Sequence, residues 1–365
     1  MESVQRRKTR VVPVGKVLLG GDHPISVQSM TSTDTADVEA TLAQAGALVE
    51  AGCEIVRVAV RDRRALPALS RIREGLPEVP LVADIHFHAH LGVAALEAGF
   101  DKVRINPGNL KDRQGLERIV AAAKAHGASI RVGVNSGSVE RELLEKHGGP
   151  TPEAMVESAL GHVRALEEMG FDRIVVSLKS TDTLATVRAC RLFSQRSDYP
   201  LHLGVTEAGP PGYGEIKTAA GLGGLLLDGI GDTIRVSLSG DPLPEVRAAY
   251  DLLKATGRRI VSPEVIACPT CGRIEVDLAP LVREVEAFAR TLRAPIRIAV
   301  MGCAVNGPGE AREADVALAG GKKEAFLYRK GKMVRKVPEK EMLQALKEEV
   351  LAYIQEEGLE GEAVG

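Results

Sequence analysis

The sequence predicts an α/β fold, a (β/α)8 barrel of the TIM type followed by a small α+β domain. The first observation is a rhythm: from residue 24 to about residue 256, short β-branched segments alternate with helical stretches, which is typical of right-handed βαβ units and a parallel sheet. The second is the count, because eight such units fit a closed barrel better than an open sheet. The third is a change of rhythm after about residue 258, which predicts a separate second domain.

The eight predicted barrel strands share β-branched residues and end in polar ones. They are ISVQSM (25–30), EIVRVAV (54–60), LVADIH (81–86), KVRINP (102–107), SIRVGVN (129–135), RIVVSLK (173–179), LHLGVTE (201–207) and TIRVSLS (233–239). Stretches rich in Ala, Leu and Glu separate them, at 37–51, 89–98, 114–126, 152–169 and 216–227 among others. Ahead of the first strand, 9–14 and 16–19 predict a hairpin that plugs the lower end of the barrel.

The second domain is predicted to be a compact α+β unit. Its strands are expected at 260–267, 296–301, 316–319 and 326–337, the last folded back at 330–332, and its helices at 278–292 and 338–355. The predicted domains are therefore 1–258 and 259–355, followed by a polar, Gly-rich tail at 356–365 that we expect to be disordered. The segment GLGG at 221–224 lies within a helical stretch, so it is not a dinucleotide fingerprint.

Composition excludes several classes of protein. The formal net charge of −2 provides no global field to attract nucleic acid or an anionic membrane. No apolar run approaches the ~20 residues that span a bilayer, and the segment VVPVGKVLLGGDH is too interrupted by Pro, Gly and charge to be a secretory signal. The five cysteines are too few for a disulfide scaffold, and their odd number is typical of a reduced, cytoplasmic protein.

Cations interrupt the predicted barrel strands. They are Arg57, Arg104, Arg131, Lys179 and Arg235. Barrel strands are normally apolar on both faces, and an arginine in the apolar layer under the helices would carry a steep desolvation cost. The cations are therefore expected in the lumen, around a ligand with more than one phosphate charge. The alternative is ion pairing with Asp84, Glu207 or acids on the helices, but two luminal acids cannot neutralise five cations.

Period-two alternation adds polar groups to the same face of these strands. Arg131 shares its face with Asn135, Arg235 with Ser237, and Asp84 with His86, so each strand carries polar residues to its carboxyl end, where barrel active sites lie. Asp84, His86 and Glu207 are the titratable groups available for proton chemistry. His86 could equally be structural, whereas Glu207 precedes the flexible AGPPGYG loop and is the favoured candidate.

Three cysteines are concentrated near the end of the chain. Cys268 and Cys271 form a CPTC motif, and Cys303 lies in the Gly-rich segment MGCAVNGPGE. Three sulfurs without a fourth fit a [4Fe–4S] cluster with one iron held differently. A zinc site with an acid as fourth ligand and a redox disulfide stay open as alternatives. Cys53 and Cys190 have helical, apolar surroundings and are interpreted as core residues.

The motifs together resemble one enzyme family. ISVQSMTSTDT, VADIHF, VRINPGN, RVGVNSGS, SLKSTDT, LGVTEAG, IRVSLS, ACPTC and MGCAVNGPGE occur in this order, from about residue 9 to residue 350. They resemble the 4-hydroxy-3-methylbut-2-en-1-yl diphosphate synthases of non-mevalonate isoprenoid biosynthesis, in their compact two-domain bacterial form. The resemblance implies reductive ring opening of 2-C-methyl-D-erythritol 2,4-cyclodiphosphate, with two electrons entering through a [4Fe–4S] cluster and water leaving.

The resemblance also implies roles for individual residues. Cys268, Cys271, Cys303 and Glu310 would be the cluster ligands, with Glu310 held weakly enough to open one iron. Arg57, Arg104, Arg131, Asn135, Lys179, Arg235 and Ser237 would hold the cyclic diphosphate, with Asp84 and His86 nearby and Glu207 as proton source. Flavodoxin or ferredoxin would donate the electrons. The family forms homodimers in which the cluster domain of one chain closes over the barrel of the other.

Two rival functions are weighed against this one. A pterin-type barrel transferase also binds a diphosphate at the strand ends, but it needs no cysteine domain. A regulatory iron–sulfur or zinc protein would use the barrel only as a ligand sensor. A radical-SAM enzyme is excluded because the chain has no CxxxCxxC motif.

Overall fold

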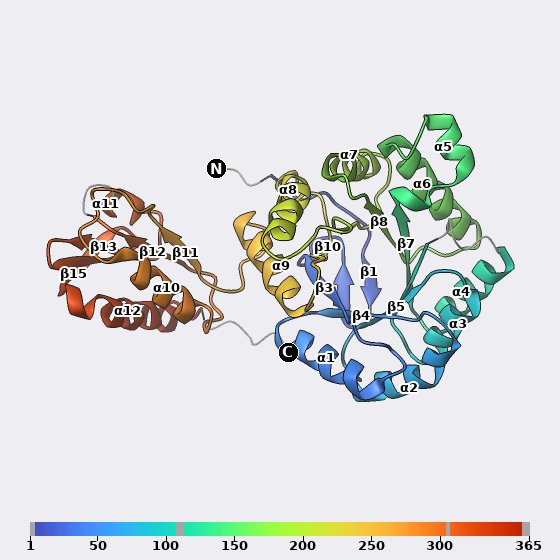
Figure 1. Ribbon diagram of the computed structural model, residues 1–365, viewed down its shortest axis with the longest axis horizontal. Coiled ribbons are helices and arrows are strands. Elements are labelled where there is room, and N and C mark those ends of the chain that lie inside the picture. The colour runs from blue at the N-terminus through green and yellow to red at the C-terminus, as the bar shows by residue number, and fades with distance from the viewer. Residues whose placement is uncertain (1–3, 107–112, 304–306, 360–365) are drawn as a thin grey trace. The chain divides into compact units, whose positions relative to one another are not determined.

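The computed structural model describes residues 4–106, 113–303 and 307–359 (Figure 1). The chain divides into two compact units, Met1–Arg258 and Arg259–Gly365. Within the described residues, no helix is both long enough and apolar enough to cross a membrane.

The first unit contains a single parallel sheet of eight strands. The strands are β3 (Ser26–Met30), β4 (Ile55–Ala59), β5 (Leu81–Ile85), β6 (Lys102–Ile105), β7 (Ser129–Asn135), β8 (Ile174–Lys179), β9 (His202–Leu203) and β10 (Thr233–Ile234). They are hydrogen-bonded in the order β8-β7-β6-β5-β4-β3-β10-β9. A parallel bridge between Val176 and Leu201 joins the two ends of this order, and Val176 N donates to Pro200 O at 2.9 Å. The nearly closed ring confirms the predicted (β/α)8 barrel.

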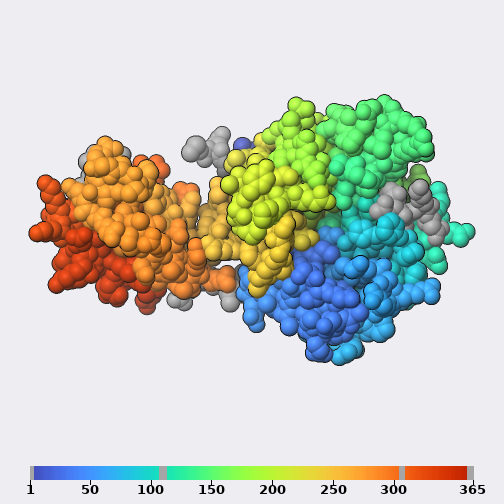
Figure 2. Space-filling view, in the orientation of Figure 1, coloured from blue at the N-terminus to red at the C-terminus, as the bar shows by residue number. Residues whose placement is uncertain are grey.

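Helices surround the strands. They are α1 (Val38–Glu50), α2 (Leu66–Gly75), α3 (Ala89–Glu97), α4 (Arg113–Ala125), α5 (Arg141–His147), α6 (Pro152–Glu168), α7 (Thr183–Ser194), α8 (Tyr213–Leu227) and α9 (Leu243–Ala255). Side chains that the sequence places just ahead of α1, α6 and α7 cap them: Asp37, Thr151 and Asp182 each accept a hydrogen bond from the backbone of the first turn. In Figure 2 the segments follow one another around this unit in chain order, from blue through green to yellow.

The last two barrel strands are shorter than predicted. Strands were expected through residues 207 and 239, but β9 ends at Leu203 and β10 at Ile234. Arg235 N still donates to Leu203 O at 3.0 Å, but farther along the chain after β10 the backbone bonds to other groups. Leu238 N, for example, donates to the carboxylate of Glu245 and not to a neighbouring strand. At Leu238, a side-chain acceptor thus takes the place of a ladder bond.

A hairpin closes the opposite end of the barrel, as predicted. Its strands are β1 (Val12–Val14) and β2 (Val17–Leu19), which pair antiparallel. Val12, Val14 and Leu19 form a buried apolar cluster with Ile55, Val82 and Val175 of the barrel strands. The lower lumen is therefore filled by side chains, and polar groups are concentrated above it. Cys53 and Cys190 are buried in the main core, which confirms their interpretation as core residues.

The second unit is an α+β sheet domain, as predicted. Its strands are β11 (Glu264–Ala267), β12 (Arg297–Met301), β13 (Val316–Gly321), β14 (Glu324–Arg329) and β15 (Lys332–Pro338), and its helices are α10 (Leu278–Ala289), α11 (Gly307–Glu310) and α12 (Met342–Glu356). β11, β12 and β13 are parallel, and β14 and β15 continue the sheet antiparallel. The terminal helix starts four residues later than predicted, because β15 extends to Pro338 and a short 3-10 turn (Glu339–Glu341) follows.

The two faces of this sheet differ. On one face, Ile298 and Leu318 pack with Val285 of α10 and Leu346 of α12. The other face carries small residues, including Ala299 and Ala317, beside the chain that follows β12. The predicted tail at 356–365 begins within a packed region, because Leu359 lies against the first face and its N donates to Ile354 O at 3.0 Å. Residues 360–365 of the tail lie outside the described residues.

Candidate functional site

Four of the predicted cations are buried together on the luminal face of the barrel. Arg57, Arg104, Arg131 and Lys179 are each less than a tenth exposed. Residues paired across neighbouring strands share a face. Because Arg131 pairs with Arg104, and Arg104 with Asp84, the three side chains form a row across β7, β6 and β5.

Asp84 is the carboxylate that holds two of these cations. Its oxygens lie 2.6 Å from Arg57 Nη2 and 3.3 Å from Arg104 Nη1. His86 Nε2, on a partly exposed ring, lies 3.1 Å away. Burial would raise the pKa of Asp84, but Arg57, His86 and Arg104 hold that pKa well below its ordinary value. Asp84 is therefore an ionised group that orients guanidinium groups, which argues against a role as proton donor.

Arg235 has a carboxylate partner that sequence reasoning missed. Glu245, in the first turn of α9, is buried and lies 3.2 Å from Arg235 Nε. Pairing of the strand cations with acids on the helices was expected only as an alternative, without a named partner. Glu245 looks like an ordinary surface acid of an amphipathic helix, and only its place in the first turn, near the strand ends, could have indicated it.

Among the described residues, Arg131 and Lys179 form no ion pair with a carboxylate, and Asp84 acts on Arg131 only from a distance. Arg131 Nε and Nη1 are buried without hydrogen-bond partners. Burial lowers the pKa of Arg131, and the neighbouring Arg57 and Arg104 lower it further, which reports mutual repulsion. Two glycines leave room for this cluster. A Cβ at Gly204 would lie 2.4 Å from Lys179 Nζ, and one at Gly133 would lie 2.5 Å from Arg104 Nε.

A deeper polar layer was not predicted. Lys102 and His202 are fully buried, and Lys102 Nζ and His202 Nε2 have no hydrogen-bond partner among the described residues. Burial, followed by the charge of Arg131, lowers the pKa of each well below its ordinary value, because both disfavour the protonated form. Lys102 was overlooked because a lysine opening a strand is ordinarily exposed.

The strand-end residues lie at the edge of the cluster. Asn135 and Ser237 are partly buried, and Asn135 N donates to Ser138 Oγ at 3.2 Å, which fixes the turn after β7. Asn106, at the end of β6, has a buried Oδ1 without a partner. Glu207 is exposed and has a positive φ of 51°. No hydrogen bond or ion pair described in the structure joins its carboxylate to the cations.

The cysteines of the second unit follow two neighbouring parallel strands. Cys268 comes directly after β11 and Cys303 two residues after β12, and Ala267 pairs with Val300 at the strand ends. Gly302 N donates to Cys268 Sγ at 3.1 Å. An amide that donates to sulfur stabilises a thiolate, as around iron–sulfur clusters. Cys271 is exposed, and hydrogen bonds from the backbone and then the side chain of Arg273 lower the pKa of its thiol.

These residues fit a cluster in chemistry and topology. Cys268, Cys271 and Cys303 are free cysteines, and Glu310, the acid that ends the MGCAVNGPGE segment, is exposed at the end of α11. In the ranges that the structure describes, which omit residues 304–306 of this segment, no three such ligands are gathered closely enough to hold a metal ion. Soft sulfur donors at the ends of adjacent strands, one of them already receiving an amide hydrogen, suit iron–sulfur coordination.

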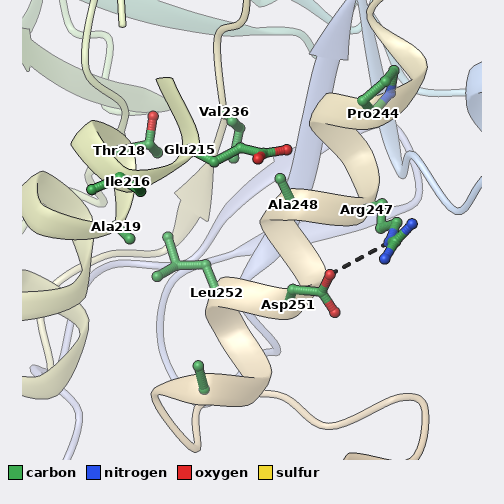
Figure 3. Close-up of a pocket in the computed structure, with 11 residues that line it drawn as sticks. Glu215, Ile216, Thr218, Ala219, Val236, Pro244, Arg247, Ala248, Asp251 and Leu252 are labelled. Carbon is green, nitrogen blue, oxygen red and sulfur yellow. Dashed lines mark ion pairs between the residues drawn. The ribbon is translucent and has the colours of Figure 1, made fainter. Parts of the chain in front are cut away.

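A surface cavity of about 520 Å³ lies apart from these groups (Figure 3). It runs between α8 and α9, and Ile216, Ala248 and Leu252 contribute apolar walls, with the Arg247–Asp251 ion pair at its border. It contains none of the predicted site residues.

Comparisons with known proteins agree with the two-unit organisation. A family model described as the GcpE TIM-barrel domain matches residues 9–250, and one described as the GcpE protein C-terminal domain matches residues 264–352. A protein of Geobacter sulfurreducens is 55% identical over 345 residues, 94% of this chain and 98% of its own. A protein of Bacillus cytotoxicus is 53% identical over 349 residues, which are 96% of this chain and 95% of that protein. Both are named 4-hydroxy-3-methylbut-2-en-1-yl diphosphate synthase (flavodoxin).

Solved structures support the barrel fold alone. Dihydropteroate synthase from Burkholderia cenocepacia, complexed with 7,8-dihydropteroate, aligns with a TM-score of 0.50 at 14% identity, covering 68% of this chain and 98% of that one. Dihydropteroate synthase from Stenotrophomonas maltophilia aligns with a TM-score of 0.50 at 16% identity. The alignment covers 68% of this chain and 97% of that one. Family models that cover both units, with relatives above half identity along nearly the whole chain, show that the chain belongs to the GcpE family.

Proposed function

We propose that this chain is a 4-hydroxy-3-methylbut-2-en-1-yl diphosphate synthase, which opens the ring of 2-C-methyl-D-erythritol 2,4-cyclodiphosphate by two-electron reduction. The observation that carries the proposal is the pair Arg131 and Lys179, buried cations with no described carboxylate partner at the mouth of the barrel. A buried unpaired charge is costly, and a ligand with two phosphate groups supplies the missing negative charge. The names of the relatives point to the same chemistry.

The barrel residues divide into binding and orienting groups. Arg131 and Lys179 are the principal phosphate ligands, since no described carboxylate competes for them. Arg57 and Arg104 present the guanidinium nitrogens that Asp84 leaves free. Asn135 and Ser237 add neutral hydrogen bonds at the strand ends, and His86 donates beside Asp84.

A proton must accompany the loss of a hydroxyl as water, because two electrons alone would leave a hydroxide. Glu207 is the proposed proton donor. It lies in the loop after β9, and its strained backbone is typical of functional positions. The exposed position of its side chain requires that the loop or the bound substrate bring the carboxyl group to the reacting hydroxyl.

The second unit is proposed to hold a [4Fe–4S] cluster through Cys268, Cys271, Cys303 and Glu310. When bound, the cluster would supply the two electrons one at a time and a Lewis-acidic iron. The chain contributes the thiolates, the amide of Gly302 that donates to Cys268, and a carboxylate ligand that is harder, and so held less firmly, than sulfur.

The proposed chemistry requires a protein that donates electrons. A flavodoxin or ferredoxin would deliver the electrons, in line with the relatives' printed name. We also propose a cytoplasmic homodimer in which the cluster domain of one chain serves the barrel of its partner. The net charge of −2 gives no reason to expect nucleic acid or membrane as a partner.

Anaerobic reconstitution tests the proposal. The purified chain should bind about four iron and four sulfide, and with reduced flavodoxin it should convert the cyclic diphosphate to 4-hydroxy-3-methylbut-2-enyl diphosphate, as followed by ³¹P NMR. One zinc per chain without turnover would support a regulatory metal protein. Condensation of a pterin diphosphate would support the transferase, which the comparisons do not favour.

A further inference from the structure

Glu245 is a buried carboxylate without a role in the proposed reaction. It lies in the first turn of α9 with 2% of its surface exposed. Its Oε2 accepts hydrogen bonds from Ser29 Oγ at 2.9 Å and Arg235 Nε at 3.2 Å. Its Oε1 accepts from Arg235 Nη2 at 3.4 Å and Leu238 N at 3.0 Å. A single carboxylate thus joins a helix, the end of β3 and the chain after β10.

These contacts determine how Arg235 is oriented. Two nitrogens of the guanidinium group are bound to the two oxygens of Glu245, a fork geometry that fixes the plane of the group. The third nitrogen, Nη1, is turned to the other side and lies 3.4 Å from Met30 Sδ. Without Glu245, the long side chain of Arg235 could take other rotamers, or turn toward Asp84 as Arg57 and Arg104 do.

The same carboxylate also holds the loop after β10. The backbone of Ser237 is held on either side, because Arg235 N donates to Leu203 O at 3.0 Å and Leu238 N donates to Glu245 Oε1. One residue later, Ser239 N donates to Gly209 O at 3.0 Å. Gly209 belongs to the loop after β9, two residues beyond Glu207. Glu245 therefore holds the loop after β10 directly and the loop after β9 through the bond of Ser239.

We infer that Glu245 is a positioning residue, which sets the orientation of Arg235 and Ser237 toward a diphosphate and braces the loop that carries Glu207. This inference rests on the proposed role of Arg235 and Ser237 in binding. The competing explanation is that Glu245 merely neutralises a buried arginine. The two explanations predict opposite signs. A lost neutralising charge would leave the site more positive and tighten anion binding, whereas a lost positioning group would weaken it.

The decisive variant is Glu245→Gln, compared with the wild-type holoenzyme under anaerobic conditions. Inorganic pyrophosphate is the probe for calorimetry, and the cyclic diphosphate is the substrate for kinetics. In the Glu245→Gln variant, the Kd for pyrophosphate should rise. The kcat/KM for the cyclic diphosphate should fall on the order of 10²-fold, mainly through a higher KM, as expected for misplaced binding groups. The iron content of the variant should stay that of the wild type. Pyrophosphate binding that is equal or tighter would overturn the inference.

Asp251→Asn is the matched control. Asp251 lies on the same helix, is half exposed, and pairs with Arg247 and Lys254 on the surface. This variant removes the same charge from α9 without touching Arg235, so its pyrophosphate binding and kinetics should match those of the wild type. A loss as large as that of Glu245→Gln would show that the effect does not depend on the contacts of Glu245 and would overturn the inference.

If Glu245→Gln does not fold, Glu245→Asp tests the positioning role in its place. It keeps the charge and shortens the side chain by one methylene group. Weaker pyrophosphate binding, with faster hydrogen exchange at residues 236–239, would support positioning. Binding like that of the wild type would show that charge alone suffices. If the wild type binds pyrophosphate but does not turn over the cyclic diphosphate, the proposed function fails, while the comparison among these variants still decides the role of Glu245.

Discussion

Arg131 stands directly opposite Arg104 in the register of β7 and β6, and of the two only Arg104 has a carboxylate partner in the described chain. Like charges opposite one another destabilise a sheet, and here both are buried. Two buried arginines that face each other are expected in a site that binds an anionic ligand, because the ligand offsets the repulsion between their charges.

Arg131→Met should stabilise the chain while weakening ligand binding. The substitution keeps most of the buried volume and removes two buried nitrogens that have no partner. We expect the free energy of unfolding to rise by about 1–3 kcal/mol, measured by urea denaturation, with pyrophosphate binding strongly reduced in calorimetry.

Arg173→Met is the control for Arg131→Met. Arg173 is exposed and donates to Gly127 O outside the lumen, so its replacement should leave pyrophosphate binding unchanged. A loss of stability in Arg131→Met together with wild-type binding would show that Arg131 is structural.

Glu207→Gln and Glu207→Gly should separate proton donation from backbone strain. Glu207 has a φ of 51°, a conformation that glycine adopts without cost. Glu207→Gly should therefore raise stability by about 1 kcal/mol, whereas Glu207→Gln should leave it unchanged. Both variants should lose turnover and keep the optical spectrum of the cluster and substrate binding. Turnover in Glu207→Gln at the wild-type rate would exclude Glu207 as the proton donor.

The buried His202 should make the barrel sensitive to mild acid. Burial, then the charges of Arg131 and Lys179, lower the pKa of His202 well below its ordinary value. As the pH falls below about 6.5, the unfolded chain therefore binds a proton that the folded chain does not, and stability is lost by up to about 1.4 kcal/mol per pH unit.

Replacement of His202 tests this pH dependence. His202→Gln should flatten the decline in the urea midpoint between pH 6.5 and 5.5, followed by circular dichroism. His126→Gln, at an exposed histidine, should keep the slope of the wild type. An unchanged slope in His202→Gln would assign the acid sensitivity to other groups.

Glu310→Cys should distinguish a reactive cluster from a passive electron carrier. An all-cysteine [4Fe–4S] cluster is coordinatively closed, so the variant should keep about four iron per chain but lose nearly all ring opening. Cys303→Ala should instead lose iron and activity together. Normal turnover by Glu310→Cys would rule out a role for an open iron position.

The barrel shows most clearly which features could be predicted from the sequence. Alternation of β-branched and helical segments is a local property, so it predicted eight parallel strands and the hairpin beneath them. The strand cations were also visible, because a charge inside an otherwise apolar run stands out. The final residues of the last two strands were assigned wrongly. After β10, Leu238 N finds its acceptor in Glu245, which a local pattern does not reveal.

Charge pairing was decided only by tertiary structure. The sequence placed five cations and two acids on the strands and in their loops. It did not show that Glu245 reaches Arg235 from a helix, or that Lys102 and His202 are buried where the charge of Arg131 acts on them. Electrostatic energy depends on distance and burial, and both depend on how elements far apart in the chain meet. The sequence by itself thus determined the fold class, the family motifs and the candidate ligands, and the folded chain decided which charges are neutralised and which stay available for a ligand.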